Sequence, residues 1–366
     1  GRPYLHAVYS LAENSRVLGL HDEATRGFER VLRLARRNGV HAFSASAEMT
    51  LGILALDARD GRALRLFESA TATARGAGHR RLEIYGEMLA GVALIRGGRP
   101  DEARERLLAN LPRASEAGEY ERLGSLVYLA DAERLSGHET SALERYRLIL
   151  ELAAEAGAPE IERDSLIGLA ALQRARGDAD AAIATARRAE AMVESMRSNI
   201  SVSTERTHFL QMRSNTYQIL AALLAERDPT DLSEPFAVVE RAHARTLREV
   251  LAGREGAEEG DSPAESLDLA AVQAGLAPGD LLLEYLLGEE ESSLLAVDAE
   301  RATFHALPPR DRIEAELLAY REVLERPASV WTARPGFRRF ADQGHELFHM
   351  LLGPVAERVG AARRLI

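Results

Sequence analysis

The sequence predicts a mainly α-helical fold: an α-solenoid of about five helical hairpins, a long helical hairpin, then a small α/β segment with a three-stranded meander. Three observations predict this order. Small residues recur every 39 or 40 residues through the first half. Glycine is then absent from about residue 186 to residue 252 while the helical pattern lengthens, and short apolar runs separated by turn residues begin at residue 281. A helical period followed by a strand-like period indicates two kinds of structure in one chain.

Three columns of small residues define the repeat and keep one register. The first column falls on the first helix of each hairpin and the second on its second helix, which a third column of glycines closes. Small residues are expected where two helix backbones approach closely as they cross. The columns are Ala12, Gly52, Gly91, Ala130 and Ala170; Ala24, Ala63, Ala103, Ala142 and Ala182; and Gly39, Gly78, Gly118 and Gly157.

The composition of the 366 residues restricts the chemistry that the chain can perform. A net charge of −11 argues against nucleic acid as the main ligand. All 46 basic residues are arginine, which excludes a P-loop lysine, a Schiff-base lysine and a lysine general base. Cysteine is absent, which excludes a disulfide framework, a thiolate zinc site and a cysteine nucleophile within these residues.

The amino-acid composition and the two ends of the chain predict where the protein is found and whether it is part of a longer polypeptide. No apolar run is long enough to span a bilayer and no signal peptide opens the chain. The arginine, alanine and glycine content is typical of a GC-rich bacterial genome, so we expect a cytoplasmic bacterial protein. The chain starts without methionine and stops as an apolar stretch begins, which predicts a piece of a longer polypeptide.

The repeat over residues 1–195 resembles the tetratricopeptide repeat, in the longer form of roughly forty residues found in bacterial regulators. It departs from that family in lacking the frequent tryptophan and the late proline. Such units cannot bury their apolar face alone and stack into a right-handed solenoid. The resemblance implies that the first helix of each hairpin lines the concave wall, where a protein or peptide partner would bind.

The candidate partner-binding residues follow from that register. Positions six before, three before, one after and four after each small residue of the first column should face the groove. The alternative is that these residues lie on a solvated helix face and bind no partner. For any single residue we consider the two interpretations about equally supported. The polar and aromatic residues selected in this way are His6, Tyr9, Glu13, Arg16, Ser46, Tyr85, Asp131, Arg134, Asp164 and Arg174.

The chain changes character twice after residue 195. Residues 196–255 keep a helical spacing of apolar residues and are expected to form long connecting helices. Residues 256–279 are acidic and rich in turn formers, which predicts a flexible linker. Strands are expected at Leu281–Leu287, Ser293–Asp298 and Ala302–Leu307, with GEEES and AER as the turns between them.

Three stretches of the second half resemble the opening of the CHAT domain, a caspase-like bacterial module that typically follows tetratricopeptide repeats. They are ERAHARTLREVLA, GDLLLEYLLGEEESSLLAVDAERATFHALP and LFHMLLGPV. The resemblance covers about residues 195–366 and makes 280–366 the incomplete N-terminal part of this domain, with a further strand at RRLI. It implies a caspase-like cysteine peptidase whose His–Cys dyad lies beyond the equivalent of Ile366, so no catalytic residue is assigned to this chain.

The sequence HELFH at residues 345–349 matches the HExxH zinc-peptidase signature. A zinc site also needs a third ligand, and the extended motif would place glycine and histidine where Leu352 and Val355 stand. The apolar residues of this stretch instead give the helix one apolar face, with His345, Glu346 and His349 toward its polar side. We therefore expect no metal and no other cofactor.

Three functions stay open at this point. The preferred hypothesis is a solenoid that binds a partner and regulates a caspase-like peptidase domain, of which only the non-catalytic first part is present. The first alternative is a non-enzymatic interaction scaffold. The minor alternative is a zinc peptidase acting through HELFH.

Overall fold

The computed structural model describes the chain except residues 1, 198–205, 244–267 and 326–333. It divides into two compact units, with the boundary between Leu172 and Gln173. We describe each unit by itself. Among the described residues, no helix combines the length and the apolar character that crossing a membrane requires.

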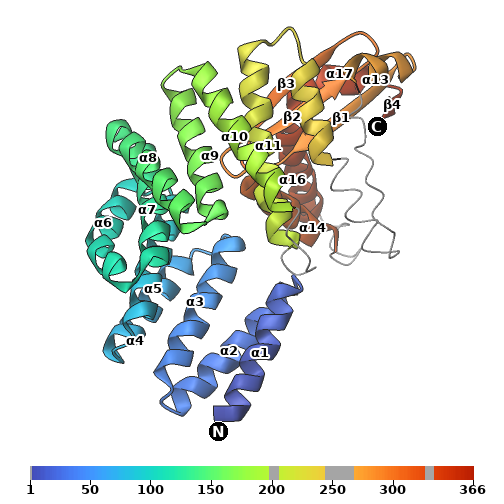
Figure 1. Cartoon of the computed structure of the whole chain (residues 1–366). Helices are drawn as coiled ribbons and strands as arrows, with labels where there is room; N and C mark the ends of the chain where they lie inside the picture. The colour runs from blue at the N-terminus through green and yellow to red at the C-terminus, as the bar shows by residue number, and fades with distance from the viewer. Residues whose placement is uncertain (1, 198–205, 244–267, 326–333) are drawn as a thin grey trace, which may run out of the picture. The chain divides into compact units, whose positions relative to one another are not determined.

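The first unit is a stack of helical hairpins (Figure 1). Each helix from α1 to α7 packs against the next one in the chain, and the first helices of successive hairpins also touch, α3 with α5 and α5 with α7. The hairpin repeat predicted for this half is confirmed. The helices are α1 Arg2–Val17, α2 His21–Arg37, α3 His41–Asp57, α4 Ala63–Gly76, α5 Arg80–Arg96, α6 Pro100–Ala117, α7 Glu119–Leu135, α8 Glu139–Ala156 and α9 Pro159–Ala175.

The small residues of the first column lie where the two helices of a hairpin cross. A Cβ atom built on Gly52 would lie 2.5 Å from the Phe67 ring, and one built on Gly91 would lie 2.8 Å from the Leu107 side chain. Phe67 and Leu107 are fully buried. Glycine is therefore required at these two positions because the large side chain from the second helix occupies the space a Cβ would need.

The third column ends the second helices as predicted, with one exception. Gly39, Gly78 and Gly157 have φ angles of 64°, 71° and 62°, the left-handed conformation that glycine adopts at helix C-termini. Gly118 was expected to do the same, but its φ of 154° and ψ of 167° differ. Here α7 begins at the very next residue, Glu119, so the chain must extend rather than curl at this position.

Ion pairs join successive hairpins in the same register as the apolar core. Arg36 of α2 lies 2.5 Å from the Glu48 carboxylate of α3, and 39 residues later Arg75 of α4 lies 2.9 Å from Glu87 of α5. Glu48 is only 1% exposed and also accepts a hydrogen bond from Ser69 of α4. Each pair links the second helix of one hairpin to the first helix of the next.

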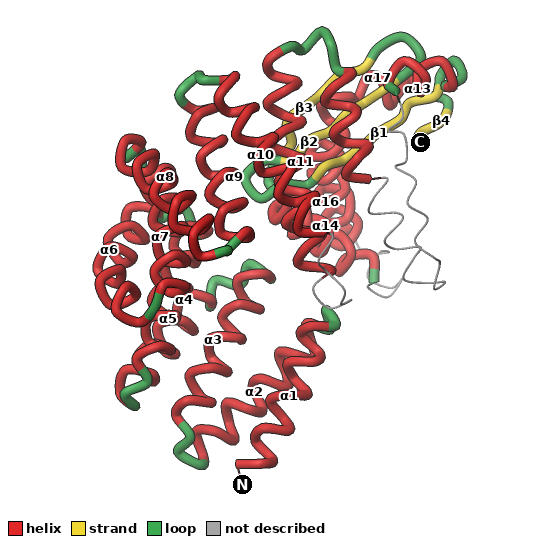
Figure 2. Tube along the Cα trace, in the orientation of Figure 1, coloured by secondary structure: helices red, strands yellow, loops and turns green. Residues whose placement is uncertain are grey.

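The second unit has helices before and after the three strands of its meander (Figure 2). Residues 269–275, within the span predicted as linker, form the short helix α13, capped by Asp268, whose carboxylate accepts from the Ala270 amide. The rest of that predicted linker up to residue 267 lies outside the described residues. The helices are α10 Ala179–Arg197, α11 Arg206–Arg227, a helix over 233–243, α13 Leu269–Gly275, α14 Arg310–Leu324, α16 Arg334–Leu352, the 3₁₀ helix Gly353–Val355 and α17 Ala356–Ala361.

The sheet has four strands in the order β3-β2-β1-β4. The predicted meander is confirmed within one residue, as β1 Asp280–Leu286, β2 Ser292–Val297 and β3 Ala302–Leu307 pair antiparallel. The stretch RRLI contributes β4, Arg364–Leu365, which pairs parallel with β1. The sheet is therefore not a pure antiparallel meander, because its edge strand β4 is parallel to β1.

Helices cover both faces of this sheet. On one face, Leu281, Leu294 and Leu307 pack with Ile313 of α14 and with Val355. On the other face, Gln218 of α11 donates a hydrogen bond of 3.2 Å to the Ser293 hydroxyl of β2. A sheet enclosed by helices in this way is a three-layer α/β arrangement.

Candidate partner-binding surface

The first two predicted residues, on α1, pack partly against neighbouring helices. The ring centres of His6 and of Phe43 on α3 lie 4.6 Å apart, with the rings edge to face. Tyr9 contacts Phe28 at 5.4 Å and Phe43 at 5.6 Å, again edge to face. His6 stays exposed while Tyr9 is half-buried, so Tyr9 contributes to the core between hairpins as well as to the surface.

Glu13 and Arg16 form an ion pair one helical turn along the same face of α1. The Arg16 Nε donates to the Glu13 carboxylate at 3.0 Å, and both side chains are about one-third exposed. Burial and then the nearby Glu13 carboxylate raise the pKa of Tyr9. A hydrogen bond from Thr50 and the charge of Arg16 lower it. Three of the four predicted α1 residues therefore interact electrostatically.

Tyr85 of α5 connects this group to the next hairpins. Its side chain is 41% exposed, and Tyr120 of α7 is 75% exposed. Burial and then Tyr120 raise the pKa of Tyr85, while Arg16 lowers it. Tyr85 is thus within electrostatic reach of α1 on one side and of α7 on the other.

Tyr128 of α7 continues the same row toward α9. Burial raises its pKa strongly, the carboxylates of Asp164 and Asp131 and the phenol of Tyr85 raise it further, and Arg96 lowers it. Asp131 accepts a hydrogen bond of 2.6 Å from Tyr146 of α8. Asp131 and Asp164, both predicted from the repeat register, therefore both raise the pKa of the partly buried Tyr128 phenol.

Arg134, another predicted residue, lies near Asp131, and Arg163 is a partner of Asp164. Arg134 lies 4.0 Å from the Asp131 carboxylate and is largely buried. Asp164 of α9 forms an ion pair with Arg163, whose side chain is buried. The polar groups at this end of the row are held by partners from the solenoid itself.

Ser46 and Arg174 behave differently from the other predicted residues. Ser46 is half-buried, and its backbone carbonyl accepts from the Thr50 hydroxyl at 3.1 Å. Arg174 belongs to the second unit, where its Nε donates to Glu226 of α11 at 2.9 Å and its Nη2 lies 3.3 Å from Glu291. Glu291 precedes β2, so Arg174 ties the end of α9 to α11 and to the β1–β2 turn.

The register missed four residues of this surface. Arg96 of α5 lies 3.8 Å from Asp57 of α3, and both stand five residues after their column glycine. Tyr128 stands two residues before Ala130, and Tyr120 lies ten before it. We define the helix-A row as the residues Tyr9, Glu13, Arg16, Asp57, Tyr85, Arg96, Tyr120, Tyr128, Asp131 and Asp164, all on the first helices of successive hairpins.

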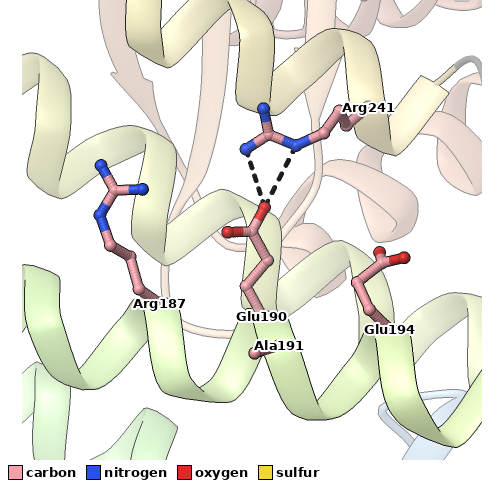
Figure 3. A pocket seen from close by; sticks show the side chains of 5 residues that line it. All are labelled: Arg187, Glu190, Ala191, Glu194 and Arg241. Carbon is pink, nitrogen blue, oxygen red and sulfur yellow. Dashed lines mark hydrogen bonds and ion pairs between the residues drawn. The ribbon is translucent and has the colours of Figure 1, made fainter. Parts of the chain in front are cut away.

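A separate hollow of about 250 Å³ lies in the second unit, between α10 and the helix over 233–243 (Figure 3). Its lining is charged, and its charges pair within or beside the wall. Arg241 donates to Glu190 at 2.8 Å, Arg187 pairs with Glu234, and Tyr217 donates to Glu194. The hollow therefore offers no uncompensated charge around which a ligand site could be argued.

The two histidines of HELFH lie on α16. Their rings are 4.2 Å apart, edge to face, and both side chains are exposed, as is Glu346. Across the described part of the chain, no group of three or more His, Asp or Glu residues could hold a metal ion. The structure thus supplies no third ligand for a zinc ion at His345 and His349 among those residues.

Comparisons with known proteins support the fold. No protein-family model matches the chain, and no curated protein matches it. A solved structure of a Rap protein complexed with competence and sporulation factor is similar, with 12% identity and a TM-score of 0.51 over 68% of this chain and 67% of that chain. The first half of the chain is a tetratricopeptide-like solenoid.

Two further solved structures align less closely. One, from Podosopora anserina, holds kinesin light chain TPR-like repeats and is 19% identical, with a TM-score of 0.45 over 53% of this chain and 96% of that chain. The other, BtubC from P. vanneervenii, is 20% identical, with a TM-score of 0.46 over 69% of this chain and 97% of that chain.

Proposed function

We propose that the helix-A row binds a protein partner. The observation that carries this proposal is the continuity of the row, in which side chains from α1, α3, α5, α7 and α9 interact with one another in sequence. Exposed tyrosines at Tyr85 and Tyr120 give it the aromatic anchors that are enriched at protein interfaces. The similar Rap protein was solved with a factor bound, which fits the same type of use.

The second part of the proposal concerns what the partner controls. The resemblance to the CHAT domain and a mixed sheet covered by helices on both faces support a caspase-like module beginning at about residue 280. In this proposal partner binding shifts the solenoid between two arrangements and thereby changes peptidase activity. The helix α11 and the helix over 233–243 would carry the shift, with Arg174 as one connection to the β1–β2 turn.

Site-specific crosslinking tests partner binding. A photo-crosslinking amino acid replaces Tyr85 in one preparation and Tyr4, an exposed tyrosine outside the row, in another. The full-length protein carrying each is irradiated in its own cells, and the attached proteins are identified by mass spectrometry. We expect one partner to attach at position 85 and not at position 4. Equal attachment at both positions, or none at 85, would contradict the proposal.

The natural gene decides the enzymatic part. We expect the reading frame to continue past codon 366 and to encode a strand-end histidine and then a strand-end cysteine. The full-length protein should cleave a peptide reporter, and the crosslinked partner should change that rate. A frame that stops near codon 366 would favour the non-enzymatic scaffold, and a cleavage rate that the partner leaves unchanged would contradict the proposed regulation.

A further inference from the structure

The outer side of α1 carries an exposed, uncharged row of residues. Figure 1 shows α1 at one end of the stack of hairpins in the first unit. Tyr4, Ala7, Leu11, Asn14 and Leu18 are all exposed, Tyr4 by 50%, Leu11 by 68% and Leu18 by 69%. Leu18 continues the helical turn, because its amide donates to the Asn14 carbonyl at 2.9 Å. We call these five residues the α1 seam, since their alternating spacing of three and four is that of the contact positions between two packed helices.

The same positions are buried in the hairpins that follow. Counted from the small-residue column, the position of Leu11 is at most 8% exposed in Leu51 of α3, Ala90 of α5 and Leu129 of α7. The position of Ala7 is likewise buried in Ala47, Gly86 and Ser125. A solenoid end that remains in water carries a polar outer face. The α1 seam instead has the composition of a contact between hairpins and is exposed.

The structure shows what covers these positions in the later hairpins. Ala47 of α3 belongs to one apolar cluster with Val31 and Ala35 of α2, and a Cβ built on Gly86 of α5 would overlap the Thr71 hydroxyl of α4. In both cases the cover is a helix, the second helix of the preceding hairpin. Three residues join each of these helices to the helix that it covers, so the two run antiparallel.

The α1 seam is complementary to a second antiparallel copy of itself. Leu11 is its middle residue, and Tyr4 and Leu18 stand seven residues before and after it. An identical helix running in the opposite direction would therefore place Leu11 against Leu11, and Tyr4 against Leu18 of the other chain. Such a contact has a two-fold axis, which is the commonest symmetry of soluble homo-oligomers.

No like charges oppose this contact along the seam. None of its five side chains is charged at neutral pH, and the charged side chains described on α1, Glu13 and Arg16, pair with each other in the helix-A row. Arg30 of α2 donates to the Tyr4 hydroxyl and lies 5.8 Å from its ring centre. The two Arg30 side chains of an antiparallel pair would be about 21 Å apart along the helix axis, beyond the screening length of about 8 Å at physiological salt.

From these observations we infer that the α1 seam is a dimer interface. A second copy of the chain packs its own α1 antiparallel against this one, about a two-fold axis near Leu11, and each copy covers the seam of the other. The inference goes beyond the proposed function, since no seam residue belongs to the helix-A row. The dimer carries two such rows, so a partner with two binding segments would bind it more tightly than it binds a single chain.

Sedimentation velocity tests the dimer on the 366-residue chain. We expect a monomer–dimer equilibrium between about 1 and about 100 µM, because one helix per copy is a small interface of modest affinity. Leu11→Glu places two carboxylates at the axis and should weaken the dimer at least about tenfold. Leu148→Glu is the matched control, since Leu148 lies on α8 and is 39% exposed. It should change the dissociation constant by less than about twofold.

Introduced cysteines test the geometry, because the chain has no cysteine of its own. Leu11→Cys should form a disulfide-linked dimer on mild oxidation, since the axis brings the two identical positions together. Tyr4→Cys and Leu18→Cys should each stay unlinked alone, whereas a mixture of the two proteins should link. Leu148→Cys is the control and should stay unlinked. These variants also decide the matter if circular dichroism shows that Leu11→Glu has lost its helix content.

The outcomes that contradict the dimer are distinct from those that concern the helix-A row. A chain that stays monomeric up to about 100 µM, or a Leu11→Cys protein that links no faster than Leu148→Cys, would overturn the inference and assign the seam to another occupant, such as a helix of a different protein. Equal weakening by the two glutamate variants, or linking of Tyr4→Cys with itself, would overturn the arrangement about Leu11. In the crosslinking experiment above, position 4 should attach a second copy of the chain, and position 85 the partner of the row.

Discussion

The two units differ in the groups that surround a buried or half-buried glutamate: arginines in the first unit and a second carboxyl group in the other. In the solenoid, Glu133 is 1% exposed and accepts two hydrogen bonds of 2.8 Å from Arg145, and Glu83 lies between Arg75 and Arg113, each 2.6 Å away. In the second unit, Glu284 at the centre of β1 faces another carboxyl group, that of Glu240 on the helix over 233–243.

The partner rather than the burial decides the charge of these groups. Hydrogen bonds from Arg113 and then Arg75 outweigh burial and lower the pKa of Glu83. Burial, followed by the hydrogen bond and the charge of Glu240, raises the pKa of Glu284 to about 9. At neutral pH the solenoid therefore uses ionised carboxylates to join its helices, while the sheet and its covering helix share a proton.

Removing a solenoid carboxylate should have the largest effect. Glu133→Ala leaves Arg145 partly buried without its counter-charge, so we expect a loss of about 3 kcal/mol in the free energy of unfolding. Urea unfolding followed by circular dichroism measures it. Glu144→Ala, at an exposed position of α8, is the control and should change stability by less than about 0.5 kcal/mol. Similar losses in both variants would show that the Glu133 pair is not special.

Removing the second-unit carboxylate should act in the opposite direction. Glu284→Gln keeps the shape and the hydrogen bond of the protonated acid but never ionises, so we expect a gain of about 1–3 kcal/mol at pH 7. Slower hydrogen exchange in the helix over 233–243 is the measurement. Glu300→Gln, in the exposed β2–β3 turn, should leave that exchange unchanged. A destabilised Glu284→Gln protein would show that this group is ionised and needed as a charge.

The pH dependence should separate the two units with a smaller effect. Glu83 has a folded pKa below its ordinary value, so its contribution is present above about pH 4.5 and is lost as the pH falls through the lowered folded value. Glu284 has a folded pKa above its ordinary value, so the folded state binds the extra proton and stability falls as the pH rises from 4.5 toward 9.

Exchange of the two regions across the pH range measures this contrast. Opening of α5 should increase on acidification, and opening of the helix over 233–243 should increase toward pH 9, after correction for the intrinsic pH dependence of exchange. Glu83→Gln should flatten the first trend alone and Glu284→Gln the second alone. Parallel trends in both regions would refute the assignment of opposite charge states.

The repeat could be predicted from the sequence because it depends on packing between helices that are close together in the chain. The glycines of the first column face Phe67 and Leu107, so the packing that requires them leaves a visible pattern. The register also found Tyr85, but it missed Tyr128 and Arg96. Offsets of −2 and +5 are seven residues apart and lie on one side of a helix, about 60° and about 40° from the offset +1 that was used. The surface therefore covers a wider arc of each helix than the four offsets assumed.

The pairing of carboxylates could not be predicted in the same way. Glu284 and Glu240 are 44 residues apart, and nothing in the alternation of β1 shows which helix covers its centre. Arg174 occupies a predicted row offset, yet its partners Glu226 and Glu291 come from α11 and the β1–β2 turn. Such contacts depend on long-range packing, which a repeat register does not contain.

The ion pairs between hairpins also determine how the solenoid deforms. The side chains of Arg36 and Arg75 are more than half exposed whereas Glu48 and Glu87 are largely buried, so dissolved salt screens these attractions only in part. The hairpins are otherwise joined by apolar contacts, which salt does not weaken. We therefore expect the stack to bend somewhat more easily as the ionic strength rises, while the apolar contacts keep the hairpins joined.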